Sequence, residues 1–253
     1  MHYIFDPLCG WCYAAAPLLE VAAQLAAAGL GSAGSGTAGS VTTGSATETA
    51  SRFRVVLHAG GMMMGRQRQT VTPRLRDYVL PHDARIEAMT GQPFGAAYRD
   101  GLLRDPSAVF DSEPPITAIL AAEQLAGAGL ALLKHLQRAH YVQGRRIANA
   151  DVLINCAEEI GLAAAQFTPM FASLQGNATL QHVEQSRRLL SDVGGRGFPT
   201  LVLETGGTLT VLPWSQYLGK PEQWREFLQN QLHVVGVQGD QAPLTCDLDS
   251  GAC

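Results

Sequence analysis

The sequence contains no apolar run long enough to cross a bilayer. No basic stretch followed by an apolar one, as in a signal peptide, precedes its first predicted strand. Charged residues make up only 16% of the 253 residues, and 18 Lys and Arg against 22 Asp and Glu leave a net charge of −4. Nucleic-acid-binding surfaces need an excess of basic residues, which is missing here. We therefore expect a cytoplasmic protein with neither a nucleic-acid partner nor a membrane partner.

The sequence also lacks the motifs of two common ligand sites. The range 31–51 is almost entirely Gly, Ser, Thr and Ala, yet it contains no GxxxxGK[ST] pattern, so a phosphate-binding loop is not expected. This composition buries little apolar surface and predicts a flexible insert over 29–51. A zinc site needs a second pair of closely spaced Cys or His ligands, and no such pair accompanies the first. The five cysteines cannot all pair within one chain.

The sequence does have a Cys-x-x-Cys motif near its start. A short apolar run over 2–5 predicts a strand, and the Ala- and Leu-rich range 13–28 predicts a helix with a kink at Pro17. Cys9 then lies at the helix N-terminus, where free N–H groups and the helix dipole stabilise an anion. A thiolate at Cys9 would attack a disulfide, and Cys12 would resolve the resulting mixed disulfide.

Two other interpretations of this motif remain open. Cys9 and Cys12 also suit one half of a zinc site, or a buried and inert pair. The Met62–Met64 run and the two thiolates together suit Cu(I), although flexible methionines beside a substrate groove are the simpler interpretation. We favour redox chemistry, because no second ligand pair is present, and we assign no metal site.

Helical patterns dominate the middle of the chain. After a strand predicted over 53–58, no strand pattern appears between Thr72 and about Val193, and we expect a compact helical bundle there. Thr72 and Pro73 have the residue types of an N-cap and a first helical position, and Pro81 is expected to separate two short helices. Cys156 is expected to be a buried, inert side chain.

The sheet pattern returns after residue 194. Strands over 200–205 and 209–212 flank Gly206-Gly207, which predicts a hairpin, and Pro221 begins a final amphipathic helix. In the tail, Cys246 and Cys253 are either two free thiols, which we favour, or a second dithiol able to exchange with the first.

Two further features point to a family. Pro17 follows the motif inside its helix, and Gly197-Phe198-Pro199-Thr200 precedes a later strand. With its features in this order along the chain, the sequence resembles thioredoxin-fold proteins. These carry CxxC after the first strand and a cis-proline loop that folds back against the CxxC motif. With its long helical segment it resembles the DsbA-like disulfide oxidoreductases, in particular the cytosolic protein-disulfide isomerases of the DsbA/FrnE-like group. The similar runs are Tyr3–Tyr13, His58–Met62, Thr72–Tyr78 and Phe110–Pro115.

The resemblance implies an α/β protein: a thioredoxin fold with a large inserted all-helical domain. It places the thioredoxin-like domain at 1–70 and 194–235, the helical domain at 71–193 and a tail at 236–253. It implies a protein disulfide oxidoreductase or isomerase that exchanges disulfides with protein or peptide thiols through a redox-active Cys9–Cys12 pair. No cofactor is implied, and glutathione is a candidate co-substrate.

The same resemblance assigns roles to the residues around the motif. It implies that Trp11 and the Phe198-Pro199-Thr200 loop bind substrate, the loop by pairing its backbone with an extended chain. Asp6 is a candidate proton relay to Cys12, although capping the turn is the more common role of such a residue. No histidine lies between the cysteines, so a weaker oxidant than the strongly oxidising members is expected.

Two rival classes share parts of this pattern. Glutathione-dependent transferases or isomerases of the kappa or hydroxychromene type have the same inserted-helix architecture, but they typically use a Ser or a lone Cys where this chain has CxxC. A non-enzymatic copper or zinc protein is the other rival. Arg145 and Arg146 are most simply a solvated helix end, with an acidic peptide or the glutathione carboxylates as alternative contacts.

Overall fold

A four-stranded mixed sheet forms the centre of the computed structural model, which describes residues 1–29 and 53–239. Its strands are β1 (His2–Phe5), β2 (Val56–Ala59), β5 (Thr200–Thr205) and β6 (Thr208–Val211), in the spatial order β2-β1-β5-β6. β1 runs parallel to β2 and antiparallel to β5, and β5 and β6 form an antiparallel hairpin. Because β1 is central, Tyr3, Ile4 and Phe5 are all buried, as is typical of a strand covered on both faces.

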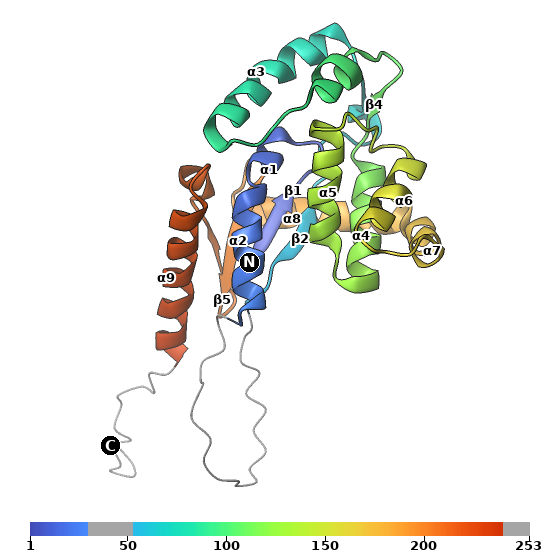
Figure 1. The fold of residues 1–253 in the computed structure, drawn as a ribbon. Coiled ribbons are helices and arrows are strands. Elements are labelled where there is room, and N and C mark those ends of the chain that lie inside the picture. Colours follow the sequence, from blue (N-terminus) through green and yellow to red (C-terminus); the bar gives the residue numbers. More distant parts are fainter. Residues whose placement is uncertain (30–52, 240–253) are drawn as a thin grey trace, which may run out of the picture.

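The Cys-containing segment connects β1 to β2 through two helices. α1 (Gly10–Ala14) ends at Ala15, and α2 (Ala16–Ala27) follows with Pro17 in its first turn. The helix is therefore interrupted at Ala15 alone, close to the predicted kink, and Pro17 takes the first turn of α2, where a proline ring is tolerated. α9 (Pro221–Gly239) packs beside α2 (Figure 1), where the buried Trp224 donates its indole N–H to the Leu18 carbonyl over 3.0 Å.

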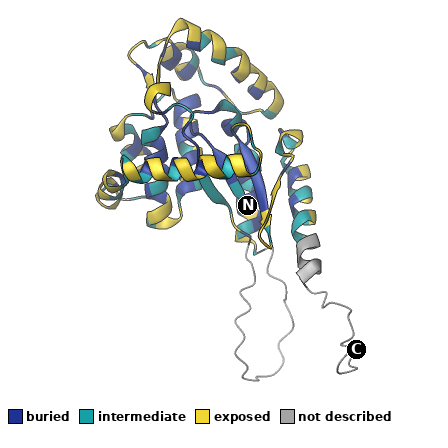
Figure 2. Cartoon of the chain, turned by 180° about the vertical axis from the view of Figure 1, so that it is seen from behind, coloured by how far each residue is buried: buried dark blue, intermediate teal, exposed yellow. Residues whose placement is uncertain are grey.

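The opposite face of the sheet is covered by α8 (Asn177–Asp192). It crosses in front of the strands in Figure 2, with its outer side exposed. His182 of α8 accepts the Ala59 N–H of β2 over 3.0 Å. α8 thus lies against the sheet, although it falls within the range 71–193 that the sequence assigns to the helical domain.

The remaining helices pack mainly on one another and extend the molecule to one side of the sheet, while α3 lies over α1 (Figure 1). They are α3 (Pro73–Thr90), α4 (Glu113–Ala126), α5 (Gly129–Tyr141), α6 (Ala150–Glu159) and α7 (Ala164–Leu174). Short helical turns lie at η1 (Gly65–Gln67), η2 (Ala97–Gly101), η3 (Leu102–Arg104) and η4 (Trp214–Tyr217). None of the helices within the described ranges is long and apolar enough to cross a membrane.

Two expectations for the helical region are wrong. α3 continues through Pro81 to Thr90, because Pro81 and Asp77, one turn earlier, both lie on the exposed side, where water can reach the freed carbonyl. A two-stranded sheet, β3 (Gln69–Thr70) with β4 (Val109–Phe110), interrupts the helices. Its strands are two residues long, too short to produce an alternating pattern.

One expectation for the helices is confirmed, and two others concern residues that the structure does not describe. The Thr72 hydroxyl oxygen accepts the Leu75 N–H over 3.1 Å, which confirms the N-cap. α9 reaches Gly239 and so enters the range predicted as tail. The predicted flexible insert over 29–51 and the tail thiols Cys246 and Cys253 lie outside the described residues, apart from Gly29, which follows α2 with a φ of 72°.

Candidate active site

The two cysteines of the motif differ in exposure. Cys9 immediately precedes α1, and its carbonyl accepts the N–H groups of Cys12 (2.9 Å) and Tyr13 (3.1 Å). Cys9 is 6% exposed and Cys12 is fully buried, and both are free thiols. Cys9 is thus the more accessible sulfur, as expected, although the pair is more covered than the sequence suggested. The Cys9 side chain makes no capping hydrogen bond to the helix N–H groups.

The loop before β5 lies directly against the first sulfur. The Phe198–Pro199 peptide bond is cis, as predicted. The Cys9 thiol donates to the Phe198 carbonyl, with 3.5 Å between sulfur and oxygen. Thr200 pairs with Ile4 in the sheet, and its hydroxyl donates to the Gly197 carbonyl over 2.8 Å, which closes the loop. The loop is therefore anchored on one side by β1 and on the other by the Thr200 hydroxyl.

The end of β2 forms the neighbouring wall. A Cβ atom at Gly60 would lie 2.1 Å from the Phe198 ring, so the ring occupies space that only a glycine leaves free. Arg187 of α8 holds this turn by donating to the Gly60 carbonyl over 2.7 Å and the Gly61 carbonyl over 2.6 Å. Three segments far apart in the sequence thus meet beside Cys9.

Asp6 lies buried beneath the motif. One carboxylate oxygen accepts the Leu8 N–H (2.8 Å) and the Ser112 hydroxyl (3.0 Å), and the other accepts the Met62 N–H (2.5 Å). The Leu8 contact is the turn-capping role that the sequence favoured. Burial raises the pKa of the Asp6 carboxyl to about 6, against the lowering effect of these hydrogen bonds and of Arg187. A carboxyl that titrates near neutrality beside the dithiol suits proton transfer.

The second sulfur is surrounded by groups of β1. The Asp6 N–H donates to the Cys12 sulfur over 3.4 Å, and the Tyr3 hydroxyl donates to the Cys12 carbonyl over 3.2 Å. Burial raises the pKa of the Cys12 thiol well above its usual range, and the adjacent Cys9 raises it further. The negative charge of Asp6 also raises the pKa of Cys12, whereas the hydrogen bond from the Asp6 N–H lowers it. Cys12 is therefore a protonated thiol at rest.

The outer side of the motif faces α3. The Arg85 guanidinium lies 5.6 Å from the centre of the Trp11 ring, within the range of a cation–π contact. Arg85 is exposed, so this cation is accessible beside the motif. Asp83 of the same helix is buried close to Gly10 and accepts the Tyr98 hydroxyl over 3.2 Å. Burial raises the pKa of the Asp83 carboxyl to about 7.

The site also contains groups that the sequence did not single out. Ser112 links Asp6 to the backbone of Met63, whose N–H it accepts over 3.0 Å. It lies in the run Phe110–Pro115, so the family resemblance was the available signal. Tyr3 likewise lies in the similar run Tyr3–Tyr13. Arg85 gave no signal, because an exposed arginine on a helix does not indicate proximity to a distant motif.

Some of the basic residues considered for substrate contact are engaged elsewhere. Arg145 donates to both carboxylate oxygens of Glu159 over 2.9 Å, and Arg146 pairs with Asp105. His58 of β2 is hydrogen-bonded to His2 over 2.9 Å, which is a structural role. Burial lowers the pKa of His58 to about 4.

A CxxC dithiol at the start of a helix, packed against a cis-proline loop on a β-α-β and hairpin framework, defines a thioredoxin-fold redox protein. The family model of the DsbA-like thioredoxin domain matches residues 2–216, and the chain belongs to this family. It is a DsbA-like thiol–disulfide oxidoreductase, with the thioredoxin fold and helical insertion that the sequence predicted.

Solved structures give the same assignment. The cytosolic disulfide reductase DsbM from Pseudomonas aeruginosa is 47% identical, with a TM-score of 0.78 over 92% of this chain and 98% of that chain. The same protein solved with glutathione is 46% identical, with a TM-score of 0.77 over 92% and 98% of the two chains. A Nitrosomonas europaea protein at 23% identity and a TM-score of 0.66, over 95% and 98%, shows a likeness of fold alone. No match was found among curated proteins.

Proposed function

We propose that this oxidoreductase is a cytoplasmic reductase of peptide disulfides and of mixed disulfides between peptides and glutathione, in which Cys9 attacks and Cys12 resolves. The observation that carries the proposal is the position of the Cys9 sulfur, 3.5 Å from the Phe198 carbonyl, while Cys12 is fully buried behind it. A substrate sulfur can approach the outer thiol only, and the inner thiol is positioned for the second step. The difference in exposure supports this order of attack.

The reaction proceeds in two exchange steps. The Cys9 thiolate attacks one sulfur of the substrate disulfide, forms a mixed disulfide and releases the other sulfur as a thiolate. Cys12 then loses its proton and attacks the Cys9 sulfur, which releases the second substrate thiolate and leaves a Cys9–Cys12 disulfide. Two electrons pass to the substrate. A thiol reductant, for which glutathione is the candidate, returns the pair to the dithiol state.

Substrate binding is assigned to the backbone beside the cis-proline. The loop at Phe198-Pro199-Thr200 would pair with an extended substrate chain, and the Trp11 ring would cover it from the α1 side. Thr200 contributes through the loop, because its own hydroxyl is bonded to the Gly197 carbonyl. Backbone pairing gives affinity with little dependence on substrate sequence.

The residues between the two sulfurs support the reductase direction. Gly10 and Trp11 carry no charge, so neither adds the stabilisation of the reduced thiolate that an intervening histidine would give. A couple of this kind is a reductant. We expect a reduction potential nearer to the value of about −270 mV of thioredoxin than to the value of about −120 mV of the strong oxidant DsbA. Equilibration with glutathione buffers measures it, and a value close to −120 mV would contradict the reductase direction.

The order of attack is tested by single substitutions at the two cysteines. Cys9→Ser should abolish disulfide reduction, whereas Cys12→Ser should accumulate a mixed disulfide between Cys9 and the substrate, detected by intact-mass spectrometry. The double variant is the control and should form no adduct at either position. An adduct on Cys12 in the Cys9→Ser variant, or full activity of that variant, would refute the assignment.

Glutathione recognition is supported by the cation next to the motif and by the similar protein solved with glutathione. Glutathione carries two carboxylates, and Arg85 is an exposed guanidinium beside Trp11. Arg85→Gln should raise KM for glutathionylated peptides several-fold and leave KM for an uncharged disulfide unchanged. The matched control is Arg74→Gln, an exposed arginine on the same helix. Equal effects on both substrates would show that Arg85 does not bind the carboxylates.

A further inference from the structure

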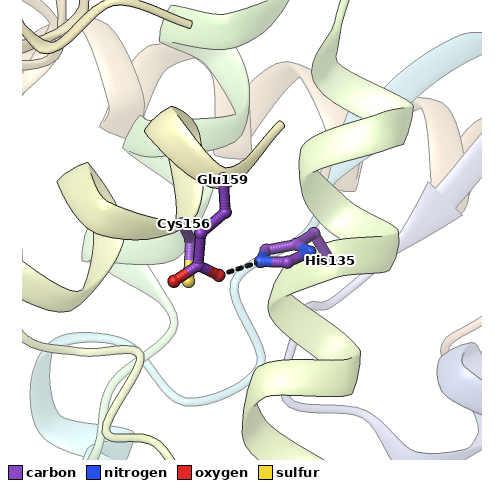
Figure 3. A group of neighbouring side chains, drawn as sticks. All are labelled: His135, Cys156 and Glu159. Carbon is purple, nitrogen blue, oxygen red and sulfur yellow. Dashed lines mark hydrogen bonds and ion pairs between the residues drawn. The ribbon is translucent and has the colours of Figure 1, made fainter. Parts of the chain in front are cut away.

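A second group of chemically active side chains lies in the helical region, outside the redox site. His135 belongs to α5, and Cys156 and Glu159 lie one turn apart on α6. Figure 3 shows the three side chains converging from the two helices. One potential ligand atom from each lies within 4.8 Å of the other two. The His135 Nε2 atom lies 2.5 Å from a Glu159 oxygen.

The donor set has the composition of a zinc site. An imidazole nitrogen, a thiolate and a carboxylate oxygen are the three ligand types that Zn²⁺ takes in proteins, at about 2.0 to 2.3 Å from the metal. Cys156 is fully buried, whereas the side chains of His135 and Glu159 are 23% and 44% exposed. The sulfur would therefore form the floor of the site, and the fourth position would open to solvent.

The separations require only a small adjustment. Ligands of a tetrahedral zinc ion lie roughly 3.3 Å apart or more, so the nitrogen and the oxygen that now form a hydrogen bond must separate. Glu159 can make this movement because its side chain lies at the surface. The ion would replace the proton that these two atoms now share.

Arg145 is the charged neighbour of the group. It donates to both oxygens of Glu159 over 2.9 Å. Its charge opposes a cation, but its hydrogen bond to the oxygen away from His135 can persist when the other oxygen binds metal. Carboxylate ligands in metal sites usually have such a hydrogen-bonding partner, which orients them.

We propose that His135, Cys156 and Glu159 form a binding site for one Zn²⁺ ion, with a water molecule in the fourth position. The ion joins α5 to α6 and is independent of the dithiol chemistry at Cys9 and Cys12. Binding releases the proton of the Cys156 thiol.

Co²⁺ is the probe, because tetrahedral Co²⁺ with a thiolate ligand has visible d–d bands and a near-ultraviolet charge-transfer band. The experiment uses the full chain with Cys9, Cys12, Cys246 and Cys253 replaced by serine, which leaves Cys156 as the only thiol. We expect one Co²⁺ per chain with both sets of bands, and displacement by one Zn²⁺. Glu159→Gln, at an exposed position, should weaken binding at least about tenfold, and Glu158→Gln is the matched control.

The thiolate ligand is tested separately. Cys156→Ser in the same background should remove the charge-transfer band, and thermal unfolding checks that this buried substitution leaves the fold intact. Because Glu159→Gln lies at the surface, it tests the site even if Cys156→Ser unfolds. The proposal is overturned if the background protein shows no saturable Co²⁺ binding, if the charge-transfer band persists in Cys156→Ser, or if Glu159→Gln binds Co²⁺ as tightly as the control Glu158→Gln.

Discussion

At the residue scale, Asp6 connects the redox pair to the rest of the molecule. Its carboxylate receives three hydrogen bonds, from two separate loops and from Ser112, while its own N–H contacts the Cys12 sulfur. A buried carboxyl with this many donors usually has a depressed pKa, yet burial outweighs them and raises the pKa to about 6. Asp6 can therefore both hold the turn and exchange a proton near neutral pH.

We predict that Asp6→Asn slows the resolving step. Below pH 6 the wild-type Asp6 is protonated and cannot accept the Cys12 proton, so the rate of mixed-disulfide resolution should rise as the pH increases through about 6. Asn cannot titrate, so the resolution rate of the variant should not rise with pH in this way. At pH 7.5 that rate should be roughly a hundredfold lower than in the wild type. Stopped-flow measurement of single-turnover resolution between pH 5 and 8 provides the test.

If Asp6 had a structural role alone, the Asp6→Asn variant would give different results. Asn offers one acceptor oxygen where Asp offers two, so some loss of stability is expected in the variant, and thermal unfolding measures it. Removal of the negative charge should also lower the pKa of Cys12, which alkylation at varied pH reports. A variant that is slower by a constant factor at every pH would mean that Asp6 only holds the turn.

The reactive residues of the site could be predicted from the sequence better than the residues that hold them in place. Cys9, Cys12 and Pro199 stand in recognisable local patterns, and the structure brings Phe198 to within 3.5 Å of the first sulfur. Ser112 and Arg187 support the site from positions far along the chain, and their roles depend on tertiary contacts that no local pattern encodes. The burial of Asp6, and hence its raised pKa, likewise follows from packing.

At the element scale, two turns meet beside the dithiol. The turn after β2 supplies Gly60, and the loop before β5 supplies the Phe198 ring that fills the space above it. Neither turn is part of a regular helix or strand, and each is held from another element, the first by Arg187 and the second by Thr200. The close approach of the two turns therefore depends on the absence of a side chain at one position.

We predict that Gly60→Ala displaces Phe198. The new Cβ would lie 2.1 Å from the ring, so the loop must move, at a cost of about 1–3 kcal/mol in the free energy of unfolding. The Phe198 carbonyl should move with it, which lowers kcat/KM for disulfide reduction. Denaturant unfolding and steady-state kinetics measure the two effects. Gly101→Ala is the control, because nothing lies within 4 Å of the added atom there.

A double variant separates steric displacement from a backbone effect. Phe198→Leu removes part of the ring, so in combination with Gly60→Ala it should recover most of the lost stability, although Phe198→Leu alone costs stability. Strict additivity of the two changes would show that the side chains do not compete for the same space.

Some helices and strands could be predicted from the sequence, and others could not. The Thr72 N-cap and the strands of the C-terminal hairpin were predictable because each depends on local chemistry. Pro81 looked like a break, but its exposed position lets α3 continue. α8 could not be assigned to the sheet, because the sequence gives its amphipathic pattern but not the surface that covers its buried side.

At the scale of the whole molecule, an aromatic cluster joins the helical insertion to α1, the helix that carries Cys12. His140 and Tyr141 of α5 pack against Tyr98 with ring centres 5.3 and 5.4 Å apart, and Tyr141 stacks on Tyr13, next to Cys12, at 4.8 Å. His140 is 2% exposed, and its Nδ1 atom has no hydrogen-bond partner among the described residues. A polar ring thus stands in an otherwise apolar contact between the two parts of the fold.

We predict that His140 makes the protein sensitive to acid. Burial lowers the pKa of His140 to about 3, whereas the unfolded chain has the ordinary value of about 6.5. Between these values the unfolded state binds the extra proton, so the stability that the neutral ring provides is complete above pH 6.5. It is lost as the pH falls, at up to about 1.4 kcal/mol per pH unit.

His140→Phe isolates this contribution from the other titrating groups. The two raised carboxyls, Asp6 and Asp83, change stability in the opposite direction over part of the same range and are present in both proteins. The difference in unfolding free energy between variant and wild type should therefore shift in favour of the variant as the pH falls from 7 to 4. The lost hydrogen bond to the Arg145 backbone adds only a constant offset. Urea unfolding at several pH values measures the difference, and a difference independent of pH would mean that folding does not lower the pKa of His140.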